Sequence, residues 1–206
     1  APAGVKLTPA LLADIFLGKI ARWNDPRLQA VAGQPKLPDA AITVVHRSDG
    51  SGTTAVFTDY LAKVSPQWKS QVGAAKAVRW PAGLGGKGNE GVTGSVKSTP
   101  GAIGYVELAY ARQNQLAMAA IENADGNFVT ASIATTSEAA AGVAMPADFR
   151  VSITNAKGKN AYPIASFTYV LIHKEQADAQ KGKAIGQFLW WAFHDGQKLA
   201  GPLDYA

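Results

Sequence analysis

The sequence predicts an α/β fold, in which buried strands alternate with amphipathic helices. Hydrophobic residues make up 47% of the 206 residues and charged residues 17%, a balance typical of a packed globular core and not of a disordered chain. Short apolar runs rich in β-branched residues alternate with longer segments of helical periodicity, which favours a largely parallel or mixed sheet. In such sheets, ligands bind outside the carboxyl ends of the strands, where helices begin.

The N-terminal part of the chain is predicted to hold three helices and one strand. Two of the helices begin with a capping hydroxyl followed by proline, at Thr8-Pro9 and at Ser65-Pro66. Gly18 marks the expected end of the first helix. The run "AITVVHR" (41–47) indicates a buried strand, and a further helix is expected from about Ser51. A strand end therefore lies shortly before a helix start.

The alternation continues through the rest of the chain. A weak helix is expected over 89–98, and a short strand over 102–105 is expected to turn directly into another helix. Asp125-Gly126 indicates the turn of a hairpin. The run "SFTYVLIHK" (166–174) indicates one more buried strand.

The last helix is expected over 177–200 and is amphipathic. Four apolar residues are expected on its inner side, namely Ile185, Phe188, Leu189 and Ala192. Three aromatic residues of the same helix are interpreted as core and partner packing and not as a ligand box, namely Trp190, Trp191 and Phe193.

Composition and charge exclude several classes of protein. The chain has no cysteine, which excludes disulfides and thiolate metal sites, and it has no apolar run near 18 residues, which excludes a membrane-spanning helix. The net charge is +5, but the basic residues are scattered singly and form no patch interleaved with aromatics, so nucleic-acid binding is disfavoured. A mildly positive field still favours a small anionic ligand.

The segment "HRSDGSGTTAVFTDYL" (46–61) carries the main candidate site, at the expected start of a helix. A helix N-terminus presents unpaired N–H groups that attract anions, and Ser51-Gly52-Thr53 adds hydroxyl donors and close access to the backbone. Arg47 can supply a planar fork suited to phosphate or carboxylate, and Asp49 can hold that fork or simply cap the turn. The alternative is that Ser51 is an ordinary N-cap with no ligand.

Other site chemistries fit the sequence poorly. The loop "GLGGKGNEG" (83–91) departs from the P-loop pattern, because Gly88 and not Ser or Thr follows Lys87, so a structural role or the rim of the same cleft is expected. The segment around Ser51 departs from the G-x-S-x-G elbow. The three histidines are far apart and have no metal-ligand spacing. No catalytic residue, metal site or cofactor is predicted.

Five segments, in this order, closely resemble the periplasmic phosphate-binding proteins of ABC phosphate importers. They are "LADIFLGKIARWND", "HRSDGSGTTAVFTDYL", "WPAGLGGKGNEGV", "PGAIGYVELAYA" and "FTYVLIHK", and the match runs from about residue 7 to the end. The resemblance implies a type II periplasmic binding protein, located in the periplasm, that closes around one inorganic phosphate between two α/β lobes. It implies delivery of the phosphate to an ABC permease in the inner membrane.

The resemblance also implies residue roles and a division of the chain. Arg47 and the helix start at Ser51, Gly52 and Thr53 would hold the phosphate, with Asp49 orienting Arg47. Residues 1–165 would form the family's second lobe, with a mixed, mainly parallel sheet flanked by helices. Residues 166–206 would be a returning strand and helix that normally belong to the first lobe, which is incomplete in this chain.

An incomplete first lobe implies limits on binding. The chain lacks the family segment with a further hydroxyl-rich helix start and an Asp that accepts the phosphate proton, so weak and poorly selective anion binding is expected. The surface that faces the first lobe would be exposed and could drive self-association. Three alternatives remain open: a receptor for another oxyanion, a shortened interaction protein, and an enzyme acting on phosphate esters.

Overall fold

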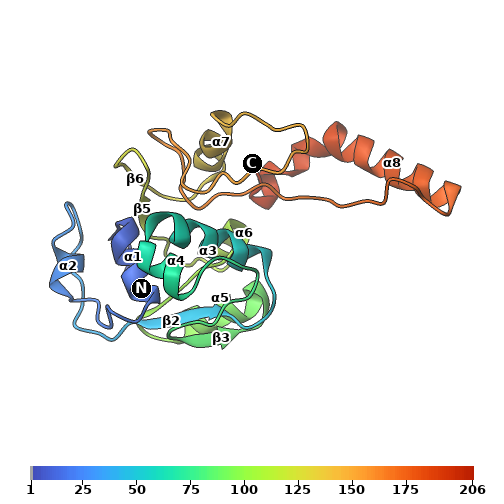
Figure 1. The fold of residues 1–206 in the computed structure, drawn as a ribbon. Coiled ribbons are helices and arrows are strands. Elements are labelled where there is room, and N and C mark those ends of the chain that lie inside the picture. Colours follow the sequence, from blue (N-terminus) through green and yellow to red (C-terminus); the bar gives the residue numbers. More distant parts are fainter. Residues whose placement is uncertain (1) are drawn as a thin grey trace.

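The computed structural model describes residues 2–206. These residues form two three-stranded sheets, and the first lies in the body of the molecule (Figure 1). Its order is β3-β2-β4, and β2 (Thr43–Arg47) pairs in parallel with both β3 (Leu84–Gly86) and β4 (Ala102–Gly104). The carboxyl ends of these strands therefore meet at one edge of the sheet. The predicted strands at 41–47 and 102–105 are confirmed.

The second sheet has the order β1-β5-β6. β1 (Lys6–Leu7) pairs in parallel with β5 (Ala120–Glu122), which pairs antiparallel with β6 (Phe128–Val129). The predicted hairpin is confirmed, since Asp125-Gly126 lies in the turn between β5 and β6 and Gly126 has a φ of +77°. The pairing is mixed and mainly parallel, as predicted, but it is divided between two sheets instead of one.

Helices pack against the first sheet and continue into the C-terminal part of the chain (Figure 1). The bounds of the α-helices are α1 Pro9–Phe16, α2 Pro26–Gln29, α3 Gly52–Val64, α4 Pro66–Gln71, α5 Gly88–Ser98, α6 Leu108–Gln113, α7 Ile133–Ala141 and α8 Ala179–Phe193. Two 3-10 segments follow, at Asp195–Leu199 and Gly201–Leu203.

The helix starts follow the local signals of the sequence. Thr8 caps α1 by accepting a hydrogen bond from the N–H of Leu11 at 3.3 Å, and Ser65 caps α4 by accepting from the N–H of Trp68 at 3.1 Å. In both helices proline occupies the first turn, where its missing N–H has no partner to lose. Gly18 follows the end of α1 with a φ of +75°, a left-handed conformation that glycine adopts without strain.

The main core lies under α1, α3 and α4 and fixes the edge at which the site is built. Trp23, Tyr60 and Trp68 are fully buried there. Phe57 of α3 packs edge-on against Phe16, with ring centroids 4.7 Å apart, and stacks on Tyr105 at 4.4 Å. Tyr105 follows β4 directly, so these aromatic contacts hold the end of β4 against the first turns of α3.

The predicted buried strand at 166–174 is wrong. These residues form no strand in the structure, and Leu171 is 93% exposed. A strand needs a neighbouring strand to satisfy its backbone N–H and C=O groups, whereas no described strand pairs with this segment. We refer to residues 166–206 as the C-terminal arm.

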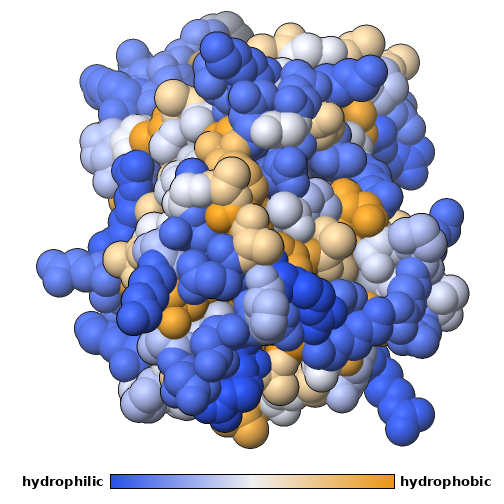
Figure 2. Space-filling view, turned by 90° about the vertical axis from the view of Figure 1, so that its left-hand side faces the viewer, coloured by the Kyte–Doolittle hydropathy of each residue, from blue (hydrophilic) through white to orange (hydrophobic). Residues whose placement is uncertain are grey.

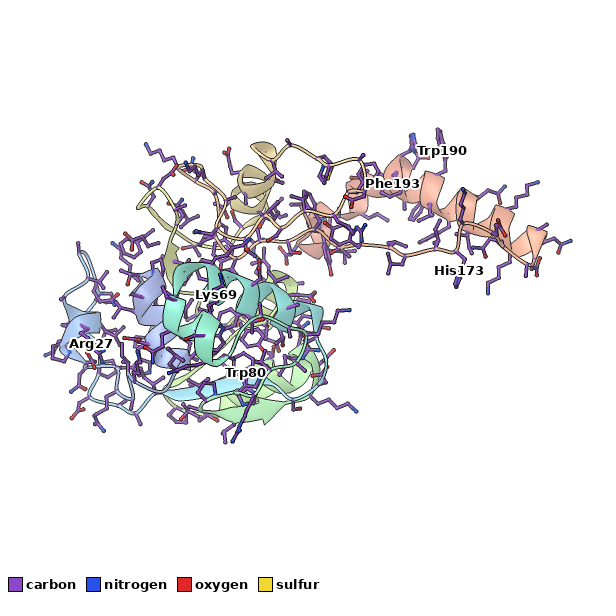
Figure 3. The ribbon with its side chains drawn as sticks, viewed as in Figure 1. Arg27, Lys69, Trp80, His173, Trp190 and Phe193 are labelled. Atoms are coloured by element: carbon purple, nitrogen blue, oxygen red, sulfur yellow. The ribbon has the colours of Figure 1, made fainter. Side chains whose placement is uncertain are left out.

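The last helix forms as predicted, but its expected inner side is not buried. α8 projects from the body within the C-terminal arm (Figure 1), and none of its residues is buried. Phe188 is 62% exposed, and the three aromatic residues expected to pack in the core and against a partner, Trp190, Trp191 and Phe193, are exposed as well. Trp190 and Phe193 are labelled on α8 in Figure 3. Core packing is therefore wrong for these residues, and packing against a partner stays a prediction. The helix nevertheless forms because its bonds are local, starting from Asp178, whose carboxylate caps it by accepting from two backbone N–H groups.

Apolar exposure is distributed unevenly over the surface. The face shown in Figure 2 is dominated by hydrophilic residues, with apolar residues between them in small groups. Most large exposed apolar side chains among the described residues lie instead in the C-terminal arm. Between residues 2 and 206, no helix is both long enough and apolar enough to cross a membrane.

Candidate anion-binding site

The candidate site lies where the carboxyl ends of the first sheet meet the starts of two helices. β2 ends at Arg47 and is followed by Asp49 and by α3, which begins at Gly52. The glycine-rich segment from β3 into α5 runs alongside. The structure brings all five predicted site residues into this one region, because β2, the loop and α3 are consecutive in the chain.

Arg47 and Asp49 form a bidentate pair. The Arg47 Nε donates to Asp49 Oδ1 at 2.8 Å, and Nη2 donates to Oδ2 at 2.6 Å. The Arg47 side chain is 10% exposed, so this pairing leaves it little freedom. The Arg47 hydrogen bonds, followed by one from the Gly88 N–H at 3.1 Å, hold the pKa of Asp49 far below its usual value. The same pairing with Asp49 raises the pKa of Arg47.

The start of α3 presents free donors. Ser51 is almost fully buried, and its Oγ accepts from the Thr54 N–H at 3.1 Å, so Ser51 is an N-cap. Within the described chain, the backbone N–H groups of Gly52 and Thr53 have no hydrogen-bond partner. Gly52 is exposed, and a Cβ placed on it would meet nothing within 4 Å. An anion can therefore approach these N–H groups from solvent.

Tyr105 connects the two elements that form the site, although sequence reasoning did not identify it. Its hydroxyl accepts a hydrogen bond from the backbone N–H of Arg47 at 3.1 Å and lies 2.7 Å from the Thr54 hydroxyl. Burial raises the pKa of Tyr105, which keeps the phenol neutral. One buried hydroxyl thus ties the end of β2 to the first turn of α3.

The glycine-rich loop contacts the Arg47–Asp49 pair, and of the two roles expected for it the contacts support the structural one. The Gly88 N–H binds Asp49, and Asn89 Oδ1 lies 3.4 Å from Arg47 Nη1. Gly86 is required by a close backbone approach, since a Cβ there would lie 2.7 Å from the backbone nitrogen of Val92 in α5. No P-loop phosphate cradle is needed to explain these glycines.

Glu107 is a further residue of the site that sequence reasoning missed. Its Oε1 accepts hydrogen bonds from the Thr53 hydroxyl at 3.2 Å and from Asn89 Nδ2 at 3.1 Å. The signal that could have found it is its position just after the strand at 102–105, at the edge where ligands bind. Together with Asp49 it places two carboxylates beside a single arginine, so free N–H groups and not net positive charge make the site attractive to an anion.

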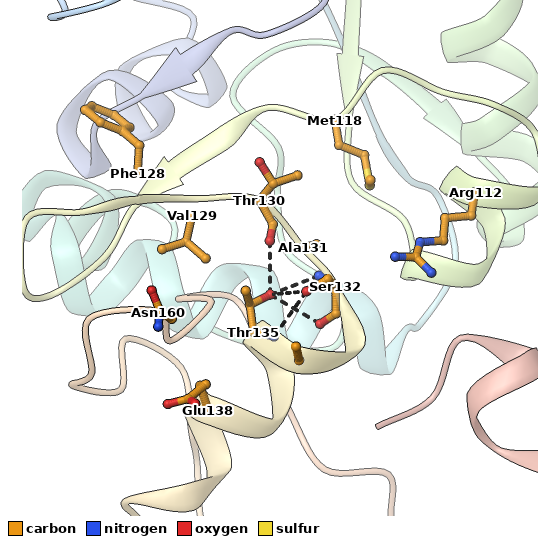
Figure 4. Close-up of a pocket in the computed structure, with 11 residues that line it drawn as sticks. Arg112, Met118, Phe128, Val129, Thr130, Ala131, Ser132, Thr135, Glu138 and Asn160 are labelled. Atoms are coloured by element: carbon orange, nitrogen blue, oxygen red, sulfur yellow. Dashed lines mark hydrogen bonds between the residues drawn. The ribbon is translucent and has the colours of Figure 1, made fainter. Parts of the chain in front are cut away.

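The larger of two cavities reaches only part of the predicted site, since Arg47, Asp49 and Ser51 line neither cavity. Gly52, Thr53 and Glu107 line the larger cavity, of about 1630 Å³, which also extends to residues of the C-terminal arm. A smaller pocket of about 650 Å³ lies between β6 and the start of α7, around the Ser132–Thr135 capping box (Figure 4). None of the five predicted site residues lines the smaller pocket.

The histidine next to the site faces a different environment. The His46 ring stacks on Trp80 with centroids 4.8 Å apart and planes inclined by 11°. Its Nδ1 lies 3.1 Å from the backbone oxygen of Arg47. His46, a residue of β2, therefore packs against Trp80, and its ring makes no hydrogen bond to the Ser51 hydroxyl that a nucleophilic mechanism would use.

Comparisons with known proteins agree with the resemblance seen in the sequence. A family described as a PBP superfamily domain matches residues 1–195. The phosphate-binding protein PstS of Xylella fastidiosa (strain 9a5c) is 48% identical over 206 residues, covering 99% of this chain and 57% of the relative. The phosphate-binding protein PstS of Pasteurella multocida (strain Pm70) is 47% identical, covering 98% and 59%. The chain thus spans less than two thirds of these relatives' length.

A solved structure supports the fold. A high affinity periplasmic phosphate-binding protein, PfluDING, bound with phosphate at pH 8.5, matches with a TM-score of 0.66 and 22% sequence identity. The match covers 91% of this chain and 57% of that chain. At this identity the likeness shows the arrangement of helices and strands, which is the α/β architecture predicted from the sequence.

Proposed function

The chain belongs to the PBP superfamily, and on that premise we propose that it binds inorganic phosphate at the start of α3. Arg47 contributes its guanidinium, Gly52 and Thr53 contribute backbone N–H groups, and Ser51 contributes its hydroxyl hydrogen. Asp49 orients Arg47. The names of the curated relatives, both phosphate-binding proteins, support phosphate as the anion.

One observation carries this proposal. The bidentate Arg47–Asp49 pair immediately precedes α3 in the chain, and the first two backbone N–H groups of α3 have no partner within residues 2–206. An ordinary N-cap requires neither Arg47 nor the Asp49 carboxylate that orients it. A tetrahedral oxyanion, by contrast, uses both the guanidinium and the backbone N–H groups as donors. Ser51 can fill both roles, because its oxygen accepts from Thr54 while its hydrogen stays free for the anion.

The wider role we propose is phosphate uptake. The protein acts in the periplasm as a binding component that delivers phosphate to an ABC permease in the inner membrane, and it performs no catalysis. The curated relatives are named as binding proteins, which supports a non-enzymatic role. No cofactor or metal takes part in this proposal.

We further propose that the chain comprises two parts of unequal completeness. Residues 1–165 form the lobe that carries the site, and residues 166–206 belong with a first lobe that the chain holds only in part. The exposed apolar side chains of the C-terminal arm support this division. A single lobe encloses the anion poorly, so binding is weak, and the exposed arm promotes self-association.

Calorimetric titration with phosphate and with sulfate tests the site. Arg47→Ala should abolish detectable phosphate binding, because it removes the guanidinium and leaves Asp49 as an unpaired negative charge. Arg79→Ala is the matched control, since Arg79 is exposed and, within residues 2–206, has no ion pair. Equal affinities for wild type and Arg47→Ala, for either ion, would remove the proposed site. A micromolar or tighter phosphate Kd would contradict weak binding by this chain.

A further inference from the structure

Residues 168–172 of the C-terminal arm have a backbone without hydrogen-bond partners. Within residues 2–206, none of their N–H or C=O groups bonds to another residue. The segment runs out from the body toward α8 as an uncoiled stretch (Figure 1). It is also apolar and open to solvent, since Val170 is 66% and Leu171 is 93% exposed. A row of free donors and acceptors flanked by apolar side chains is the chemistry of an unpaired strand edge.

The side chains of the segment already alternate as in a strand. The rings of Phe167 and Tyr169 have centroids 6.5 Å apart, close to the spacing of alternate side chains along an extended chain. The Tyr169 hydroxyl donates to the Val151 carbonyl oxygen at 3.1 Å and accepts from the Val151 N–H at 3.3 Å, which anchors this face to the preceding loop. Because successive side chains point to opposite faces, Val170 is directed away from that anchor. The segment lacks only a second strand.

The strand edges described within the same copy are too short for this segment. The edges of the two sheets are β1 and β6, of two residues each, and β3 and β4, of three residues each. A strand of five residues placed beside any of them would leave much of its backbone unpaired. A second copy of the chain, by contrast, offers a strand of equal length with the same free backbone groups.

The segment is complementary to itself in an antiparallel arrangement. Pairing centred on Val170 places Val170 opposite Val170, and Tyr169 opposite Leu171. Cross-strand pairs of β-branched, aromatic and aliphatic side chains stabilise a sheet. Lys174 would then lie opposite Ser166. Parallel pairing in register would instead place Lys174 opposite the same residue of the second copy, and like charges directly opposite each other are destabilising.

We propose that residues 168–172 of two copies pair antiparallel about Val170, and that this two-stranded ribbon joins the chains in a two-fold dimer. The inference rests on the proposed self-association of the C-terminal arm and names the strand that forms the contact. A two-stranded ribbon is only marginally stable by itself. The exposed aromatic residues of α8, which follows the segment in the same arm, provide further apolar surface to bury.

Disulfide trapping tests the register, because the chain has no cysteine of its own. In the proposed ribbon the two copies of residue 170 face each other within the distance that a disulfide spans. Val170→Cys should therefore form a covalent dimer with oxidised glutathione, at a concentration at which wild type sediments as a dimer. Ile172→Cys is the matched control, since Ile172 is 55% exposed and lies on the same strand face. Its two copies would lie about 13 Å apart, beyond the reach of a disulfide.

Proline substitutions test the backbone hydrogen bonds. Neighbouring N–H groups of a strand point to opposite edges, so either Val170 or Leu171 donates to the second copy while the other faces solvent. Val170→Pro and Leu171→Pro, made separately, should therefore differ. One should raise the dissociation constant of the dimer about tenfold in sedimentation equilibrium, because each chain loses a hydrogen bond of the ribbon, and the other should change it little. Both side chains are exposed, so neither substitution should impair folding.

The outcomes distinguish this inference from the proposals around it. A dimer that is trapped by neither cysteine or equally by both, or that responds equally to both prolines, overturns the antiparallel ribbon and leaves association through α8 in place. A wild-type chain that stays monomeric at all concentrations overturns both the ribbon and the proposed self-association. The phosphate site takes no part in the ribbon, so its own titration remains a separate test.

Discussion

Arg47 and Asp49, two residues apart in the chain, face each other through two nearly parallel hydrogen bonds of 2.8 and 2.6 Å. The pair uses the Nε edge of the guanidinium and leaves Nη1 directed toward Asn89. An arginine held in this way loses little further freedom when it binds an anion, which is the physical advantage of an oriented fork.

Loss of the Asp49 carboxylate, which orients Arg47, should weaken phosphate binding. Asp49→Asn replaces one of the two acceptors by an NH₂ group that faces Arg47 Nη2, so the guanidinium loses its fixed orientation. We expect the phosphate Kd to rise about tenfold, the scale of one charge-assisted hydrogen bond. Asp39→Asn is the control measured by the same titration, because Asp39 forms an exposed pair with Arg22. An equal effect of both substitutions would contradict an orienting role for Asp49.

The same pair predicts how stability depends on pH. The folded-state pKa of Asp49 lies below its usual value of 3.8, so the carboxylate form is stabilised by folding. That contribution is fully present above about pH 4 and is lost as the pH falls from 3.8 toward the lowered folded pKa. The difference in unfolding free energy between wild type and Asp49→Asn should therefore shrink over this acid range in urea titrations. A difference in unfolding free energy that stays constant from pH 7 down to pH 2 would contradict a stabilising role of the ionised Asp49 carboxylate.

Removal of the Tyr105 hydroxyl should destabilise the fold. Tyr105→Phe keeps the stack on Phe57 but leaves the backbone N–H of Arg47 without its acceptor and the Thr54 hydroxyl without its partner. We expect a loss of about 1–3 kcal/mol in the free energy of unfolding. Tyr110→Phe is the control, because the Tyr110 hydroxyl lies outside the core and binds Glu90. Similar losses for both variants would show that the buried hydroxyl has no special role.

The C-terminal arm should control self-association. Trp190 and Phe193 are 68% and 67% exposed, so burial between two chains would remove apolar surface from water. The double change Trp190→Ser and Phe193→Ser should shift sedimentation velocity profiles toward the monomer at a given concentration. Gln187→Ser on the same helix is the control and should leave the profiles unchanged. A wild-type chain that is monomeric at all concentrations would rule out the proposed association.

Features that depend on neighbouring residues could be predicted from the sequence. The caps at Thr8 and Ser65 and the turn at Gly126 each involve bonds within a few residues, so their signals are local. The Arg47–Asp49 pair is local as well. It could be located because a strand, a short loop and a helix start follow one another in the chain.

Features that depend on distant contacts could not be predicted. Glu107 meets Thr53 across 54 residues, and Asn89 meets Arg47 across 42, so no spacing rule brings them together. The expected strand at 166–174 fails for a related reason. Its composition favours a strand, but a strand is stable only beside a partner, and in the described structure none lies next to it.

The tryptophans divide into groups that an optical experiment can distinguish. Trp23 and Trp68 are fully buried, Trp190 and Trp191 are exposed on the C-terminal arm, and Trp80 stacks on His46 beside Arg47. A soluble quencher such as iodide would quench the fluorescence of Trp190 and Trp191 first, because these side chains are exposed. Covering the arm would protect that emission, so one fluorescence experiment can follow self-association without an added label.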